Sequence, residues 1–263
     1  MHAPKIFVLK GSGTPDYDGL IQGISECSAN DWKSFLAECG DVSMTELERF
    51  KAIARSGYYP VGSVFVFPGG HVMRISDALE LGAVASDGET PVLSRTGIAI
   101  KQVLNNPGLR FRALGSCAGA ALLSRELQIN YPGFPPLPCL GILPDTAAIG
   151  SLHKGPAMHE LLDGRDAIPA QLGWDNIGFS SDKKESEVVA TYKSGTTAIM
   201  QNSKAFATGP HLEAMHEGSE LRALAEKTQG VTLPFFATAE TEVASARAAK
   251  KMVDNFLRPE TKE

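Results

Sequence analysis

A cysteine stands between two glycines in the pentapeptide GSCAG at residues 115–119. The apolar run at 111–114 precedes it, and the small residues after it suit the first turn of a helix. This is the form of the nucleophile elbow G-x-S-x-G, in which a sharp strand-to-helix turn exposes the reactive side chain. We expect the helix N-terminus to favour a Cys117 thiolate, and the N–H of Ala118 to point toward a developing oxyanion. The alternative is a structural cysteine buried in a tight turn.

A histidine and a glutamate with the spacing His-x-Glu occur in GPHLE at 209–213. A cysteine nucleophile needs a base, and the base needs a group that orients it. His211 could be the base, because the Glu213 carboxylate is placed to reach the far nitrogen of its ring. The alternative is a turn histidine beside a solvated glutamate. His216 and Glu217 are second candidates, expected in a following helix that faces elsewhere.

The tripeptide PGG at 68–70 follows the apolar run at 63–67. Glycine allows a backbone to approach a ligand closely, so the N–H of Gly69 or Gly70 could be a second oxyanion donor. His71 comes next and is a candidate for substrate contact or a rival base. The alternative is an ordinary turn at the end of a strand.

The elements that must position these residues alternate along the chain. Apolar, β-branched or aromatic runs predict strands at 6–9, 63–67, 111–114, 187–192, 196–200 and 205–208. Helical spacing and capping patterns predict helices at 16–27, 43–56, 94–105, 118–127, 221–227 and 240–257. The proline-rich segment 131–138 is expected to be a loop, and 149–175 has no clear period and is expected to be irregular.

Alternating strands and helices predict an α/β fold with a mostly parallel sheet that is covered on both faces. Ligands of such sheets bind outside the carboxyl ends of the strands. The PGG turn, Cys117 and His211 all fall at predicted strand ends. The sequence therefore predicts that they share one crevice.

The composition limits the remaining function classes. Hydrophobic residues make up 43% and charged residues 21% of 263 residues, which suits one large α/β domain over residues 1–263. The net charge of −5 gives no general attraction to nucleic acid or to anionic lipid. No apolar stretch approaches the roughly 18 residues of a membrane span.

The cysteines predict neither a metal centre nor a disulfide framework, because none forms a C-x-x-C pair. The run at 5–9 is too short for a secretory signal. We therefore expect a reduced, cytoplasmic setting for all four thiols, which are Cys27, Cys39, Cys117 and Cys139.

Taken together, these motifs resemble those of class I glutamine-amidotransferase-like domains, and most of all the biotin-protein-ligase N-terminal-domain type (BPL_N). The similar segments are VFPGG at 66–70, GSCAGA at 115–120, TYKSG at 191–195 and TGPHLE at 208–213, in the same order. The resemblance covers roughly residues 4–215 and leaves 216–263 as a C-terminal helical extension.

The resemblance implies a flavodoxin-like three-layer sandwich with a mostly parallel central sheet. It implies a triad in which Cys117 is the nucleophile, His211 the base and Glu213 the orienting group. It also implies oxyanion-hole amides at Gly70 and Ala118, with Gly69 and His71 close to the substrate. No metal and no organic cofactor is implied.

One position departs from the family pattern. Glutamine-hydrolysing members usually carry a glutamine two residues after the second elbow glycine, and BPL_N members often carry an aromatic residue there, whereas this chain has Ala121. The chain also has no ligase or synthetase half, so any enzyme that accepts released ammonia would be a separate protein.

Three functions remain open from the sequence. The first is an amidase-type hydrolase acting on a small-molecule or peptide carboxamide or a related acyl group. The second is a cysteine peptidase or deglycase-like enzyme on the same fold. The third is a non-catalytic binding module whose cysteine contacts a ligand or senses redox state. The segments 149–175 and 240–257 are candidates for a cap over the site or a homodimer interface.

Overall fold

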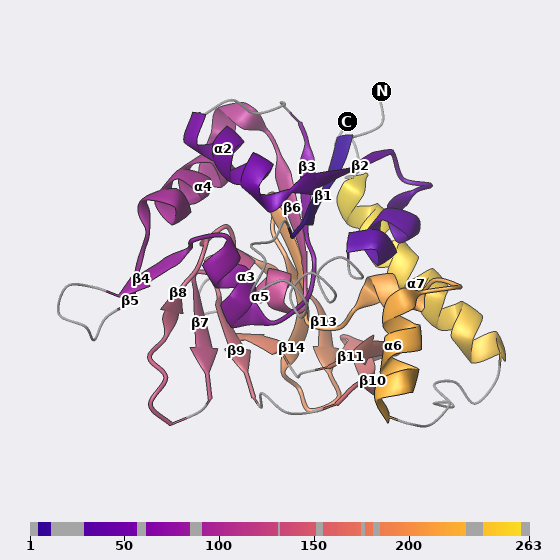
Figure 1. Ribbon diagram of the computed structural model, residues 1–263. Helices are drawn as coiled ribbons and strands as arrows, with labels where there is room; N and C mark the ends of the chain where they lie inside the picture. The colour runs from indigo at the N-terminus through magenta and orange to yellow at the C-terminus, as the bar shows by residue number, and fades with distance from the viewer. Residues whose placement is uncertain are drawn as a thin grey trace.

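The computed structural model describes residues 5–11, 29–56, 62–84, 91–130, 132–150, 155–174, 177–180, 185–229 and 239–258. They form a mixed α/β fold around one large sheet (Figure 1). The helix predicted at 16–27, together with Cys27, lies outside these residues. No described helix is long and apolar enough to cross a membrane.

Five adjacent parallel strands form the part of the sheet that carries the predicted site. Their order is β2 (Asp41–Glu46), β1 (Lys5–Lys10), β3 (Val64–Phe67), β6 (Arg112–Ser116) and β15 (Ala205–Thr208). Every residue of β3 and β15 is buried, as expected for parallel strands that are covered on both faces. The predicted α/β fold with a parallel central sheet is confirmed here.

Beyond β15 the sheet continues with mainly antiparallel pairing. It passes through β14 (Thr197–Gln201), β12 (Ile177–Ser180), β9 (Thr146–Ile149), β7 (Glu126–Ile129) and β8 (Leu137–Pro138). The strands β13 (Glu187–Tyr192), β14 and β15 form the predicted meander. A separate two-stranded sheet contains β4 (Gly82–Val84) and β5 (Pro91–Leu93).

Helices cover the two faces of the parallel strands, and each face has its own apolar cluster. Alternate strand residues such as Phe65 and Phe67 face the cluster that includes α2 (Leu47–Ser56), α3 (Val72–Ala78), α4 (Arg95–Asn105) and α5 (Ala118–Leu123). Their neighbours Val64 and Val66 face the cluster that includes α6 (Glu220–Gln229) and α7 (Ala239–Leu257). The period-two alternation of a strand explains this division.

Strand β6, which leads to Cys117, is held at its N-terminal end by hydrogen bonds to α7. The Arg112 guanidinium donates hydrogen bonds to the carbonyls of Phe256 and Leu257 near the C-terminal end of α7. A cation at that end of a helix is favourable, because unpaired carbonyls gather there.

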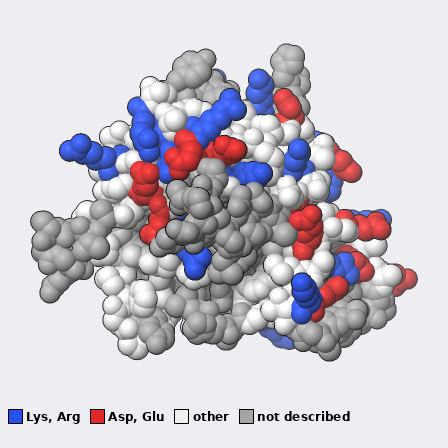
Figure 2. All heavy atoms as spheres, viewed as in Figure 1, with Lys and Arg blue, Asp and Glu red and all other residues white. Residues whose placement is uncertain are grey.

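On the face shown in Figure 2, acidic and basic side chains are interspersed.

The helix predicted at 43–56 is wrong in its first turn. Residues 41–46 form β2, which pairs with β1 over six residues, and α2 begins only at Leu47. Val42 and Met44, two alternate residues of β2, pack against the apolar cluster that includes α6 and α7. Pairing and burial of this alternating pattern outweigh the local capping signal.

The helix predicted to reach residue 127 is also too long. It ends at Leu123, where the Ser124 hydroxyl donates to the carbonyls of Ala121 and Glu126. Residues 126–129 then form β7, with Leu127 and Ile129 buried on one face. A serine that bonds to local carbonyls competes with helix continuation.

Residues 157–173, within the segment 149–175 that was expected to be irregular, form a hairpin. Its strands are β10 (Ala157–Asp163) and β11 (Asp166–Gly173), and β10 pairs with β13 at the side of the large sheet. The turn between them contains Gly164 in a left-handed conformation, with φ of 60°. Glycine at the first of the two turn residues, Gly164-Arg165, accepts this positive φ without steric cost.

Candidate active site

The turn from β6 to α5 has the geometry of a nucleophile elbow. Cys117 lies at its apex with φ of 50° and ψ of −116°, in a region that residues with a Cβ rarely adopt. Such a conformation costs about 1–3 kcal/mol and persists only where the surroundings impose it. The Cys117 N–H donates to the carbonyl of Thr208, 2.8 Å away on the neighbouring strand β15. The side chain is buried.

The two elbow glycines are required by the backbone around them. A Cβ on Gly115 would lie 2.7 Å from both Cα and N of Ala120. A Cβ on Gly119 would overlap the carbonyl of Phe67 and lie 2.7 Å from that of Pro68. Helix α5 can therefore pack against β6 and the end of β3 only because positions 115 and 119 carry no side chain. This packing brings the PGG turn next to Cys117.

His211 is placed directly after β15, where it caps the short 3-10 helix η2 (Leu212–Met215). Its N–H donates to the carbonyl of Leu172, 2.6 Å away on β11. The edge-to-face ring of Trp174 lies 5.4 Å from the imidazole, measured between centroids. Both contacts come from the end of the β10–β11 hairpin. No sequence motif had indicated a role for either residue.

The His211 ring pairs with Glu213 through Nδ1, which lies 2.7 Å from Oε1. Glu213 is fully buried and His211 is 3% exposed. Burial acts to lower the pKa of His211, but the charges of Glu213 and Cys117, together with hydrogen bonds to both, raise it well above its usual value. The structure thus brings the three predicted residues together and favours a protonated imidazole.

Ser116, which is not among the predicted site residues, also contacts His211 and Glu213. Its hydroxyl lies 2.9 Å from Oε1 and 3.0 Å from Oε2 of Glu213, and 3.3 Å from Nδ1 of His211. Its side chain is fully buried. The only sequence signal was its place beside Cys117 at the end of an apolar strand.

The PGG turn lies against both Cys117 and His211. A Cβ on Gly69 would lie 3.2 Å from Cβ of Cys117 and 3.2 Å from Nε2 of His211. Gly70 has φ of 150°, and no described residue accepts a hydrogen bond from its N–H. Ala118 is the first residue of α5, where an N–H has no acceptor within the helix.

His71 lies apart from the cluster of Cys117, His211 and Glu213. It is exposed at the N-terminal end of α3, and no described hydrogen bond or ring contact joins it to Cys117 or His211. His216 faces elsewhere as expected, with Nε2 3.2 Å from Asp31, and Glu217 is exposed. However, His216 follows the short helix η2 rather than lying within a longer helix. Across the described part of the chain, no group of three or more His, Cys, Asp or Glu side chains is arranged to hold a metal ion.

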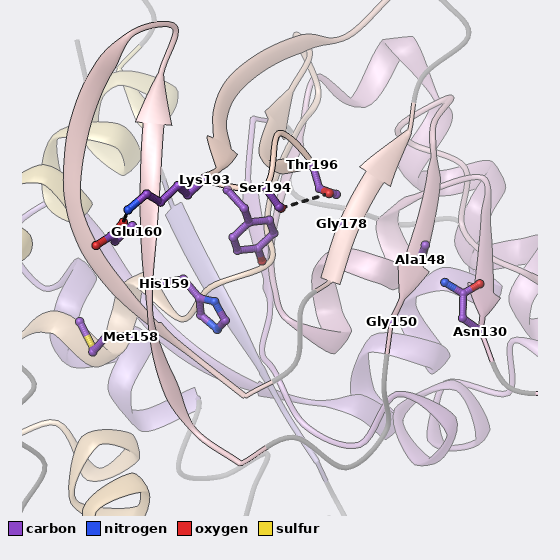
Figure 3. Close-up of a pocket in the computed structure, with 11 residues that line it drawn as sticks. Asn130, Ala148, Gly150, Met158, His159, Glu160, Gly178, Lys193, Ser194 and Thr196 are labelled. Carbon is purple, nitrogen blue, oxygen red and sulfur yellow. Dashed lines mark hydrogen bonds and ion pairs between the residues drawn. The ribbon is translucent and has the colours of Figure 1, made fainter.

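A cavity of about 470 Å³ lies against the β10–β11 hairpin and β13, and none of Cys117, His211 and Glu213 lines it (Figure 3). The hairpin residues His159 and Glu160 form one side of it, and Glu160 pairs with Lys193 at 2.6 Å. Its lining includes the small residues Ala148, Gly150 and Gly178. The other described residues that line it are Asn130, Met158, His159, Glu160, Tyr192, Lys193, Ser194 and Thr196.

Tyr192 is shared between this cavity and the surroundings of Cys117. Its hydroxyl donates to the carbonyl of Ile177 at 3.0 Å and contacts the position of Gly209, two residues before His211. Burial, and to a lesser degree the nearby Cys117 charge, raises the pKa of Tyr192. A molecule in the cavity would therefore contact a residue that also lies near the thiol.

Two solved structures share the fold. One, a glutamine amidotransferase, has a TM-score of 0.51 and 16% sequence identity, covering 86% of this chain and 99% of its own. The other is a glutamine amidotransferase from Thermotoga maritima, with a TM-score of 0.53, 12% identity and complete coverage of both chains. No family model and no curated protein matches the sequence. The chain thus has the fold of glutamine-amidotransferase-like proteins.

Proposed function

We propose that this protein is a cysteine-dependent hydrolase of carboxamides or related acyl compounds, with Cys117, His211 and Glu213 as its catalytic triad. The observation that carries the proposal is the buried His211–Glu213 pair, joined at 2.7 Å, whose imidazole lies beside the cysteine of a strained elbow, next to Gly69. An imidazolium beside a thiol favours the thiolate, which is the attacking form.

The proposed reaction follows from the positions of these groups. The Cys117 sulfur attacks the carbonyl carbon, and the resulting oxyanion is stabilised by the amides of Ala118 and Gly70. His211 donates its proton to the leaving amine, so that the tetrahedral adduct collapses to a thioester. Water, deprotonated by His211, then attacks the thioester and releases the acid and the free thiol. Glu213 holds the imidazole in the tautomer that both steps need.

A small amide is the substrate that the surroundings favour. A cavity of about 470 Å³ has the volume of small-molecule sites, and its lining residue Tyr192 contacts the position of Gly209, two residues before His211. Gly69 and His71 are the proposed substrate contacts on the opposite turn. Ala121 is buried in α5 and offers no polar group for a glutamine side chain.

The finer classification belongs to the same proposal. A three-layer, flavodoxin-like arrangement of the BPL_N type fits the apolar clusters on both faces of the parallel strands. A single domain over residues 1–263 fits the bond between β6 and α7, which ties the beginning of the nucleophile strand to the C-terminal helix. A reducing setting, which we propose to be the cytoplasm, would keep Cys117 a thiol.

The test is to alkylate the protein with iodoacetamide across pH and to locate the label by mass spectrometry. We expect rapid labelling of Cys117 well below pH 8, no label at this position in Cys117→Ser, and slower labelling in His211→Ala. A wild-type protein whose Cys117 reacts no faster than an ordinary thiol would overturn the proposal and leave a binding module. Amide, peptide and glycated-substrate panels then separate the amidase from a peptidase or a deglycase.

A further inference from the structure

We propose that Ser116 is a positioning residue that holds the Glu213 carboxylate in line with His211, which makes a four-residue chain from Ser116 to Cys117. This inference rests on the proposed function, since it concerns the same base. The Ser116 hydroxyl lies between the two carboxylate oxygens, 2.9 Å from Oε1 and 3.0 Å from Oε2. Both side chains are fully buried.

The carboxylate needs such a donor because it is shut away from water. A buried carboxylate is stable only when hydrogen-bond donors or a positive charge surround it. Oε1 lies 2.7 Å from Nδ1 of His211, whereas Oε2 has Ser116 as its donor among the described residues. Without this hydroxyl the carboxylate is free to rotate away from the imidazole, which would break the contact between Oε1 and Nδ1.

The orientation of the imidazole follows from the same contacts. With the Ser116 O–H directed at Glu213, the Nδ1 proton of His211 is directed to Oε1 and Nε2 is left for Cys117. Nδ1 is also 3.3 Å from the Ser116 oxygen, so the hydroxyl limits the rotation of the ring.

The role proposed for Ser116 differs from that of the buried hydroxyl beside it in the sheet. Ser116 pairs in register with Thr208 on β15, a second fully buried hydroxyl. Thr208 donates to the carbonyl of Pro210 at 2.8 Å and so supports backbone, whereas Ser116 supports an ionised side chain. A buried hydroxyl in an apolar strand is costly without a partner, and here the partner is the orienting group of the base.

The experiment compares the pH profile of Cys117 alkylation in wild type, Ser116→Ala and Ser116→Cys. A thiol is close in shape to the serine hydroxyl but is a weaker donor. We expect the midpoint of the profile to rise by about one pH unit in Ser116→Ala and by less in Ser116→Cys, because a hydrogen bond to a charged group is lost or weakened. At a pH below both midpoints, the rate should be about tenfold lower in Ser116→Ala than in wild type. Mass spectrometry distinguishes the label on Cys117 from label at position 116.

Ser124→Ala is the matched control, since Ser124 is also fully buried and bonds local carbonyls at the far end of α5. Its profile should equal that of wild type. If Ser116→Ala does not fold, Ser116→Cys decides the result. A wild-type midpoint in the folded Ser116 variants would overturn this inference and leave the proposed triad intact, whereas an unreactive wild-type Cys117 would overturn the triad itself.

Discussion

The imidazole of His211 lies where a side chain on Gly69 would have to be. A Cβ at position 69 would overlap Cε1 of His211 and lie 3.2 Å from both Nε2 and the Cβ of Cys117. The proposed base and nucleophile therefore meet over a glycine, and the imidazole also contacts the ring of Trp174 edge to face.

The first prediction concerns this glycine. Gly69→Ala should displace the His211 ring and slow Cys117 alkylation at pH 7 by about 100-fold, because misplacing a catalytic group by about 1 Å has an effect of this size. Stopped-flow labelling measures the rate. Gly82→Ala is the control, since a Cβ there has nothing within 4 Å. Equal rates for the two variants would contradict the role given to Gly69.

The second prediction concerns the elbow. Gly119→Ala should lower the free energy of unfolding by at least about 2 kcal/mol, because the added Cβ would lie 2.6 Å from the carbonyl carbon of Phe67. The obstacle is backbone, which cannot rotate aside as a side chain can. Urea unfolding of the variant measures the loss against Gly82→Ala. A stability within about 0.5 kcal/mol of wild type would show that α5 can shift away from β3.

The third prediction concerns stability and pH. The pKa of His211 is raised in the folded protein above the value of about 6.5 in an unfolded chain. Its ionisation therefore adds stability that is fully present below about pH 6.5 and is lost as pH rises through the folded pKa. The difference in unfolding free energy between wild type and His211→Gln should shrink over that range, by about 1.4 kcal/mol for each pH unit that separates the folded pKa from the unfolded pKa. A difference that is constant from about pH 6 upward would contradict a raised pKa.

The fourth prediction concerns the other described thiols. Burial, with a hydrogen bond and the charge from Asp254, raises the pKa of Cys39 to about 11. Burial raises the pKa of Cys139 to about 12. At pH 8 the native protein should therefore carry label on Cys117 while both of these cysteines stay unmodified, and both should react once urea unfolds the chain. Labelling of Cys39 or Cys139 in the folded state, at the rate of Cys117, would contradict this.

The parallel core could be predicted from the sequence because its signals are local. The apolar run at 63–67 is strong enough to identify β3 within one residue, and the helix predicted at 94–105 is α4, which begins one residue later because Ser94 is its N-cap. The proposed triad could be selected because each residue follows such a strand. Strand ends are the places that a parallel sheet brings together.

The hairpin was missed because its pattern depends on distant partners. Strand β11 is exposed or half-buried along its first five residues, and Gln171, which is fully buried, donates to the carbonyl of Ser245 on α7. No window of sequence around 171 contains that partner. The same limit hid Trp174 and Leu172, whose contact with His211 exists only once the hairpin has folded against the sheet.

Ser116 was missed for a related reason. Its side chain meets Glu213, which is 97 residues away. A serine beside the proposed nucleophile carries no spacing rule of the kind that links His211 to Glu213. Only the parallel pairing of β6 with β15 places its hydroxyl under the carboxylate.

The steric closure around the elbow also bears on how such a chain diverges. At Gly69, Gly115 and Gly119 an added methyl group meets backbone or the imidazole, so neutral drift is blocked at these positions. Positions such as Gly82 and Gly150, where a Cβ meets nothing within 4 Å, leave drift unopposed. A lineage under these constraints would lose overall identity to its relatives long before it lost the spacing of a few small residues. In this chain the elbow is therefore defined as much by the three positions where a side chain is forbidden as by the side chains that are present.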